Sequence, residues 1–254
     1  MSRTSRRQFL LQSVSLLGSL LLAGCDRLSH SQWFTRMLAI AESLNKGVRK
    51  GTDNRLSMAQ EFSEADLSPS FRSNGTARPA SAEYQRLAAG GFTDYRLEVG
   101  GLVTTPLSLS LDEIRALPSR TQITRHDCVE GWSAIGKWKG ARLSALLQKA
   151  QPSSAARYVV FRCADSLEEG SDPYYESIDM DDAYHEQTLL AYELNDSILP
   201  VENGAPLRLR VERQLGYKMA KYVMRIELVD KLDDIGAGHG GYWEDQGYQW
   251  YAGI

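Results

Sequence analysis

Cys128 stands in a polar run whose residue types suit a soft metal. A thiolate is both a nucleophile and a soft metal ligand, and neighbouring cations such as Arg125 or a protonated His126 lower the pKa of a thiol. The carboxylates of Asp127 and Glu130 disfavour a second negative charge unless a metal cation neutralises it. The local chemistry favours metal ligation over a free nucleophile, and the alternative is a small buried hydrophobic cysteine. The full run is Arg125-His126-Asp127-Cys128-Val129-Glu130-Gly131-Trp132-Ser133.

A second polar region, later in the chain, suits an anion. It contains Arg208, whose planar fork of donors fits a phosphate or the edge of a heterocycle. Lys218 and Lys221 follow with a spacing that lets both reach one anion across a turn. The alternative for these cations is a solvated charged strand and turn. The two segments are Asn203-Gly204-Ala205-Pro206-Leu207-Arg208 and Gly216-Tyr217-Lys218-Met219-Ala220-Lys221.

Several segments together resemble the molybdenum cofactor domain of the sulfite oxidase superfamily. They cover about residues 60 to 254 and occur in the family's order: HDCVEGWS, GKWKG, NGAPLRLRV, LGYKMAKYVMRIELVD and GGYWEDQGYQWYAGI. The chain is closer to the bacterial periplasmic branch, which includes the catalytic subunits of methionine sulfoxide reductases, than to sulfite oxidase itself. The resemblance implies a molybdopterin-dependent oxidoreductase with molybdenum and molybdopterin as cofactors.

The resemblance also implies site residues. Cys128 corresponds to the molybdenum ligand and is the candidate catalytic residue. A buried strand thiol is the alternative for Cys163, a surface turn is the alternative for Asn74, and a disulfide between Cys128 and Cys163 competes with metal ligation. The positions that correspond to cofactor contacts are Asn74, Cys163, Asn203, Arg208, Lys218, Met219 and Lys221.

Three histidines are weaker candidates. His126 either hydrogen-bonds the cofactor or ends a strand, and His185 is expected on the surface rather than at a helix start near the pocket. His239, among glycines, is expected in a loop that borders the substrate entrance. None of the three has metal-ligand spacing to another.

The residues after Cys128 bear on the substrate. Sulfite oxidases carry an arginine cluster there to hold the anion, whereas this chain continues Val129-Glu130-Gly131-Trp132, and Gly75 replaces a histidine common beside the Asn. A carboxylate and an aromatic face suit an uncharged or cationic substrate better than an anion. The expected reaction is a two-electron oxygen-atom transfer on a small or protein-borne substrate other than sulfite.

Electrons must be exchanged with a separate carrier, because the chain has no Cys-x-x-Cys-His heme attachment motif. A membrane heme subunit or a soluble cytochrome is the expected partner. Two alternatives remain: a cofactor-free binding lipoprotein that retains the fold, and a thiol redox protein that uses Cys128 and Cys163.

The first twenty-five residues read as a targeting segment. Ser5-Arg6-Arg7-Gln8-Phe9-Leu10 is a twin-arginine signature, and the apolar stretch to Ala23 is short for a membrane span, although an uncleaved anchor helix is the alternative. Leu22-Ala23-Gly24-Cys25 resembles a lipobox, so Cys25 is expected to tether a periplasmic protein to the inner membrane. Cleavage leaves 254 − 24 = 230 residues with a net charge of −3 − 3 = −6, which disfavours nucleic-acid binding.

The mature chain is predicted to be α+β, with a helical spacer over 26–62 and one compact mixed α/β domain over 63–254. Apolar residues from Trp33 to Val48 recur at helical spacing, which predicts a helix over 30–62, and Ser63–Pro79 is expected to be irregular. Alternation from Tyr95 to Val99 predicts a strand that ends in a turn at Gly100-Gly101. Further strands are expected at 122–125, 157–163, 207–211 and 223–229, with helices at 111–117, 143–150 and around Asp181.

Overall fold

The computed structural model describes residues 31–34, 36–38, 40, 41, 44, 57–167 and 170–254. The chain divides into two units, Met1–Arg55 and Leu56–Ile254. The predicted signal segment, residues 1–25, lies outside the described residues. The described residues from 32 to 44 are helical, as predicted. Among the described helices, none is long and apolar enough to cross a bilayer.

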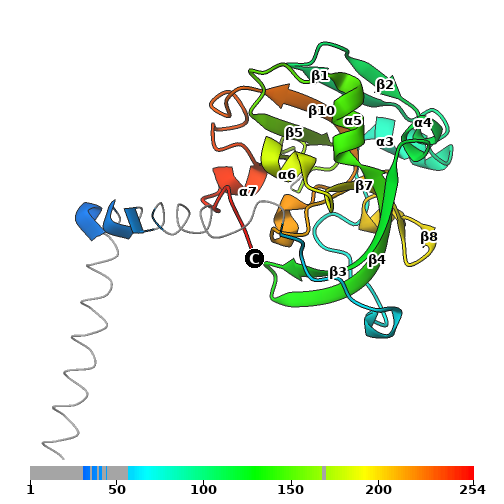
Figure 1. Ribbon diagram of the computed structural model, residues 1–254, viewed down its shortest axis with the longest axis horizontal. Coiled ribbons are helices and arrows are strands. Elements are labelled where there is room, and N and C mark those ends of the chain that lie inside the picture. Colours follow the sequence, from blue (N-terminus) through cyan, green and yellow to red (C-terminus); the bar gives the residue numbers. More distant parts are fainter. Residues whose placement is uncertain (1–30, 35, 39, 42–43, 45–56, 168–169) are drawn as a thin grey trace, which may run out of the picture. The chain divides into compact units, whose positions relative to one another are not determined.

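The second unit contains two sheets, of which the first is mixed and the second is antiparallel (Figure 1). In the first, the strand order is β2-β1-β10-β5-β6, and only the β1–β10 pair is parallel. Its strands are β1 (Leu97–Gly101), β2 (Leu107–Leu109), β5 (Tyr158–Cys163), β6 (Tyr175–Asp179) and β10 (Val223–Val229). The predicted α+β class is confirmed.

The second sheet has the order β3-β4-β7-β8, with β9 also paired to β7, and all its pairs are antiparallel. Its strands are β3 (Ser119–Cys128), β4 (Trp132–Arg142), β7 (Leu189–Leu194), β8 (Ser197–Ile198) and β9 (Arg208–Arg210). The long β3–β4 hairpin is the curved ribbon in Figure 1. It carries Cys128 at the last paired position of β3, opposite Trp132.

Short helices fill the connections. They are α3 (Ala82–Ala89), α4 (Leu111–Arg115), α5 (Leu143–Ala150), α6 (Met180–Tyr184) and α7 (Tyr242–Asp245), with single 3₁₀ turns η1 (Glu64–Asp66), η2 (Val201–Asn203) and η3 (Gly216–Lys218). Helix α5 buries Leu143, Leu146, Leu147 and Ala150, which recur at helical spacing on one face. These residues belong to one core cluster with β1, β5, β10 and β7.

Several predicted elements are confirmed, with bounds that differ by a few residues, and others are corrected. Gly100 and Gly101 do not form a turn, because both remain in β1 and pair with Glu227 and Leu228 of β10. Strands β2, β4, β6, β7 and β8 and helices α3 and α7 were not predicted. Strands β6 and β7 are buried on both faces and therefore lack the alternation that marks a half-buried strand.

The predicted helix over 30–62 is wrong at its end, because residues 57–62 are not helical. Glu61 forms an antiparallel bridge with Thr124, and Phe62 N donates to Ile123 O at 2.9 Å. This segment lies along β3, which is the outer strand of its sheet and has unpaired backbone groups to offer.

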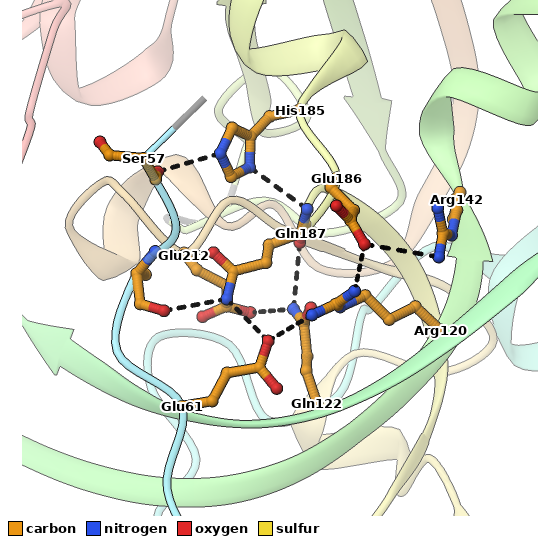
Figure 2. Close-up of polar contacts among 10 residues, drawn as sticks. Ser57, Glu61, Arg120, Gln122, Arg142, His185, Glu186, Gln187 and Glu212 are labelled. Carbon is orange, nitrogen blue, oxygen red and sulfur yellow. Dashed lines mark hydrogen bonds and ion pairs between the residues drawn. The ribbon is translucent and has the colours of Figure 1, made fainter. Parts of the chain in front are cut away.

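Gln187 fastens this segment through its side chain (Figure 2). Its Oε1 accepts from Ala59 N at 2.7 Å, and its Nε2 donates to Ala59 O and to Glu61 Oε1, both at 3.0 Å. Beside it, His185 Nδ1 accepts from Gln187 N and His185 Nε2 donates to Ser57 O. His185 is therefore buried, and the prediction of a surface histidine is wrong.

Candidate active site

A cavity of about 190 Å³ opens beside the end of β3. Cys128 lies on its wall together with residues from four other parts of the chain. The lining residues are Asn74, Gly75, Thr76, Cys128, Val129, Glu130, Asp165, Leu167, Tyr174, Gly216, Tyr217, Met219, Ala220, Lys221, Trp243 and Tyr248. The candidate residues Cys128, Asn74, Met219 and Lys221, predicted from separate segments, are thus brought to one cavity.

The environment of Cys128 favours the protonated thiol. Burial raises its pKa, and the Glu130 carboxylate acts in the same direction, against a hydrogen bond from the Glu130 backbone N–H and the more distant charge of Arg208. Arg125 does not assist, because its Nε bonds the Asp127 carboxylate at 3.0 Å on the surface. A thiol with a raised pKa makes a poor free nucleophile, whereas a metal cation would favour its thiolate.

His126 is buried and neutral, which corrects the expected help from a protonated ring. Burial, followed by the charges of Arg208 and Arg210, lowers its pKa well below the usual value. Its Nδ1 accepts from Arg210 Nη1 at 3.1 Å and lies 3.2 Å from Met219 Sδ. His126 therefore connects the strand of Cys128 to the segment of Met219.

Arg210, which donates to His126, is itself held by a buried carboxylate. Its guanidinium donates twice to the Glu212 carboxylate, at 2.8 and 2.6 Å, and both side chains are fully buried. The guanidinium carbon lies 4.3 Å from the ring centroid of Trp138, and that of Arg208 lies 5.4 Å from it. Trp138 is the aromatic residue of the GKWKG segment. Its ring packs against the guanidinium groups of both arginines, as a cation–π contact.

Asn74 and Lys221 form the polar side of the cavity, and Arg208 contacts Asn74 from outside the lining. Arg208 Nη2 donates to Asn74 Oδ1 at 3.1 Å, and Arg208 Nη1 donates to the Asn203 carbonyl at 3.0 Å. Lys221 Nζ donates to three carbonyls, those of Asn74, Thr76 and Glu202, at 2.5 to 2.8 Å. Asn74 is thus more than a surface turn: its loop is held by two cations. Arg208 and Asn203 lie directly behind it and do not line the cavity.

These groups fit an acceptor-rich cofactor. Arg208 Nε and Asn203 Nδ2 are buried donors with no partner among the described residues, and a buried donor of this kind is stabilised by an acceptor. Burial lowers the pKa of Arg208 to about 9 and that of Lys221 to about 7. An anion near them would offset this cost of burying positive charge. The donor set therefore suits a pterin edge or a phosphate, while Cys128 offers a sulfur ligand.

Lys218 does not join this set. Its ammonium lies between the carboxylates of Glu176 and Glu244, at 2.5 Å from each, and all three side chains are fully buried. Lys218 and Lys221, predicted to reach one anion, have separate partners in this structure, because Lys221 Nζ donates to the carbonyls near Asn74 instead. Lys218 instead connects β6 to α7.

Cys163 lies in β5 within the main core cluster and does not line the cavity. Both Cys128 and Cys163 are free thiols, so the structure contains no disulfide between them. Burial raises the pKa of Cys163 well above its usual value, as expected for a strand thiol in the core.

Several cavity residues were not predicted. Asp165 is almost fully buried, its Oδ1 has no partner in the described chain, and burial raises its pKa to about 6. Trp243 and Tyr248 come from the aromatic C-terminal segment, whose composition was the available signal. Thr76 follows the Asn74 loop directly. His239, predicted to border the entrance, is exposed and bonds Asp245 Oδ1 at 3.0 Å without lining the cavity.

A metal here would depend on very few protein ligands. Within the described residues there is no group of three or more His, Cys, Asp or Glu side chains placed to hold a metal ion. Cys128 is therefore the protein ligand that the site offers, and the remaining ligands would have to come from an organic cofactor, as the sulfurs of a pterin dithiolene do.

Comparisons with known proteins identify the family. The family model "Oxidoreductase molybdopterin binding domain" matches residues 86–234. A protein of Azospira oryzae, provisionally named protein-methionine-sulfoxide reductase subunit YedZ1, is 38% identical over 98% of this chain and 88% of its own length. The protein-methionine-sulfoxide reductase catalytic subunit MsrP of Xanthomonas axonopodis pv. citri is 31% identical over 90% of this chain and 71% of its own length.

A solved structure is also similar. The crystal structure of the sulfane dehydrogenase SoxCD from Paracoccus pantotrophus matches with a TM-score of 0.50 and 25% identity, covering 55% of this chain and 39% of that chain. The family match spans more than half of the residues, and relatives align along nearly the whole chain. The protein therefore belongs to the oxidoreductase molybdopterin binding domain family: it is a molybdopterin-dependent oxidoreductase of the sulfite oxidase superfamily, with molybdenum and molybdopterin as its cofactors.

Proposed function

We propose that this protein is the catalytic subunit of an exported reductase that removes the oxygen atom from methionine sulfoxide in proteins. The reaction consumes one sulfoxide, two electrons and two protons, and yields one thioether and one water. The bound molybdenum supplies the two-electron redox chemistry and the oxygen-atom transfer.

The observation that carries the proposal is the convergence of Cys128 with the Asn74, Arg208 and Lys221 cluster around one cavity. In this assignment Cys128 ligates the metal, while Arg208 and Asn203 donate to the cofactor. Lys221 holds the Asn74 loop and contributes positive charge toward the phosphate. Asp165, whose pKa is raised to about 6, can hold a proton inside the cavity.

The substrate side supports a neutral sulfoxide. Among the described lining residues Lys221 is the one cation, and its ammonium already donates to three carbonyls. Glu130 adds negative charge, which disfavours an anion such as sulfite. The relatives named for protein-borne methionine sulfoxide support the same substrate class.

Export and electron supply complete the proposal. The twin-arginine signature and the lipobox at Cys25 support a periplasmic protein tethered to the inner membrane. Electrons would come from a separate carrier, a membrane heme subunit or a cytochrome, because the chain carries no heme attachment motif. The name "catalytic subunit" of the Xanthomonas relative supports a second subunit.

The deciding experiment measures metal and pterin in the purified mature protein. Wild type expressed with intact export and cofactor synthesis should hold near one molybdenum and one pterin per chain and should reduce methionine sulfoxide in an oxidised protein with an artificial electron donor. Cys128→Ala should abolish reduction, because the thiolate that fixes and tunes the metal is missing.

Cys163→Ala is the matched control, because it removes the other described thiol from the core rather than from the cavity. It should keep metal, pterin and turnover. Wild type without molybdenum and pterin would instead support the cofactor-free binding lipoprotein, and the loaded enzyme without sulfoxide turnover would exclude the proposed substrate while leaving the enzyme class intact.

A further inference from the structure

The C-terminal segment supplies one wall of the cavity. The family model ends at residue 234, and the residues beyond it include α7 and the two aromatic lining residues Trp243 and Tyr248. Tyr248 is 41% exposed, so it lies at the mouth, whereas Trp243 is partly buried. Cys128 and Val129 line the same cavity from the β3–β4 hairpin.

The aromatic rings of this wall contact one another. The ring centroids of Trp243 and Tyr248 are 5.2 Å apart at 47°, and those of Tyr217 and Tyr248 are 5.3 Å apart at 77°. Tyr248 N donates to Trp243 O at 3.0 Å, and Tyr217 OH donates to the Gln249 carbonyl. These bonds hold the ring faces in one arrangement, so little ordering is needed when a ligand binds.

The wall suits a methyl sulfoxide group. Aromatic rings make favourable contacts with sulfur and with the positively polarised groups attached to it. A neutral, dipolar group does not require the cation that an oxyanion requires, and the ammonium of Lys221 is already bonded to carbonyls.

Lys218 fixes this wall to the sheet. Its ammonium bonds Glu244 of α7 and Glu176 of β6, and all three side chains are fully buried. Trp250 adds a second attachment, because its Nε1 donates to Ser177 Oγ at 2.8 Å and its ring lies 5.2 Å from Lys218 Nζ. Removal of one partner from such a buried ion pair strongly destabilises a protein, because a buried charge is left without compensation.

We propose that Trp243 and Tyr248 are specificity-determining residues that receive the methyl sulfoxide end of the substrate side chain, and that Lys218 is a positioning residue that holds them through Glu244. This inference rests on the proposed function. It assigns Lys218 to the substrate side of the molecule rather than to the cofactor.

The test compares Trp243→Ala and Tyr248→Ala with Tyr184→Ala in the loaded enzyme. Tyr184 is a matched control because it is 42% exposed, like Tyr248, and does not line the cavity. Loss of one sulfur–aromatic contact should raise KM for a methionine sulfoxide peptide by about five- to tenfold, since such contacts contribute up to about 1.5 kcal/mol.

The outcomes separate the two proposals. If wild type with molybdenum and pterin does not reduce the sulfoxide peptide, the proposed function and this inference both fail. If wild type reduces it but KM stays unchanged in both aromatic variants, only this inference fails.

Lys218 is tested by Lys218→Met and Lys218→Arg. Met should raise KM with molybdenum and pterin content and kcat preserved, and Arg, which keeps a cation between the two carboxylates, should restore the wild-type KM. Loss of pterin in Lys218→Met, with far-UV circular dichroism unchanged, would make Lys218 a cofactor residue and overturn its positioning role.

Discussion

Gly216 lies against the ring of His126. A Cβ at this position would come within 2.4 Å of His126 Cε1 and 2.5 Å of Nε2, and His126 is fully buried among aromatic and basic side chains. The ring cannot move without displacing Met219 or Arg210. Gly216 therefore sets how closely η3 approaches the strand that carries Cys128.

Gly216→Ala is expected to reduce both stability and cofactor content. Overpacking of a well-packed interior typically costs about 1–3 kcal/mol, and the displaced backbone here lies next to Asp127 and Cys128. Urea unfolding and molybdenum analysis of the purified variant would measure the two effects.

Gly100→Ala is the appropriate comparison, because a Cβ there would meet no atom within 4 Å. It should keep full molybdenum content and lose less than about 1 kcal/mol of stability. Equal behaviour of the two variants would contradict the close-contact argument.

At the residue scale, the sequence identified several residues that line the cavity, but it did not predict positions that depend on tertiary packing. Cys128, Asn74 and Lys221, predicted from separate segments by their chemistry, line one cavity. Lys218 lies three residues from Lys221, yet Glu176 and Glu244, remote in sequence, determine where it points. Asp165 gave no sequence signal, because its significance arises from burial alone.

At the scale of the elements, the segment 57–62 lies along β3 with a single backbone bridge, between Glu61 and Thr124. Gln187 bonds Ala59 in both directions, in the way that a neighbouring strand would. Figure 2 shows Arg120 extending this contact to Glu61 on one side and to Glu186 on the other. Side-chain bonds from Gln187 and Arg120 therefore hold the segment 57–62 in place of a continuous series of backbone hydrogen bonds.

Gln187→Leu should release this segment with little effect on turnover. The change preserves the volume of the side chain and removes three hydrogen bonds, which together contribute about 1–3 kcal/mol. Hydrogen exchange at the Ala59 amide should accelerate, and limited proteolysis should cut near residues 57–62 more quickly.

Gln60→Ala provides the reference for that experiment, because Gln60 is an exposed neighbour in the same segment. Its exchange and proteolysis should match wild type. Slow exchange at Ala59 in Gln187→Leu would mean that the bridge between Glu61 and Thr124 suffices to hold the segment.

Elements with clear periodicity were predicted with useful bounds. Helix α5 was found at its full length because its apolar residues recur on one face, and β10 because it alternates. Strand β4 was missed because its lysines and glycines conceal its pattern; Gly140 is required there, since a Cβ would come within 2.4 Å of Leu190 O. Such a close approach between two backbones depends on tertiary structure and cannot be read from local sequence patterns.

For the whole molecule, the proposed lipid anchor gives a direct prediction. Cys25→Ser should abolish attachment of lipid, so the protein should fractionate with soluble periplasmic proteins while it keeps molybdenum, pterin and sulfoxide turnover. Ser29→Ala, a change of similar size a few residues away, should stay with the membrane. Membrane attachment of Cys25→Ser would favour an uncleaved anchor helix.

The cavity is assembled from segments that are far apart in the chain. Asn74 bonds Arg208 and Lys221 across separations of 134 and 147 residues, and β1 pairs with β10 near the other end of the domain. During synthesis Asn74 therefore leaves the ribosome long before its partners exist, and a nascent chain has no cofactor site. The order of events in the cell follows: translation must be nearly finished before cofactor loading can begin.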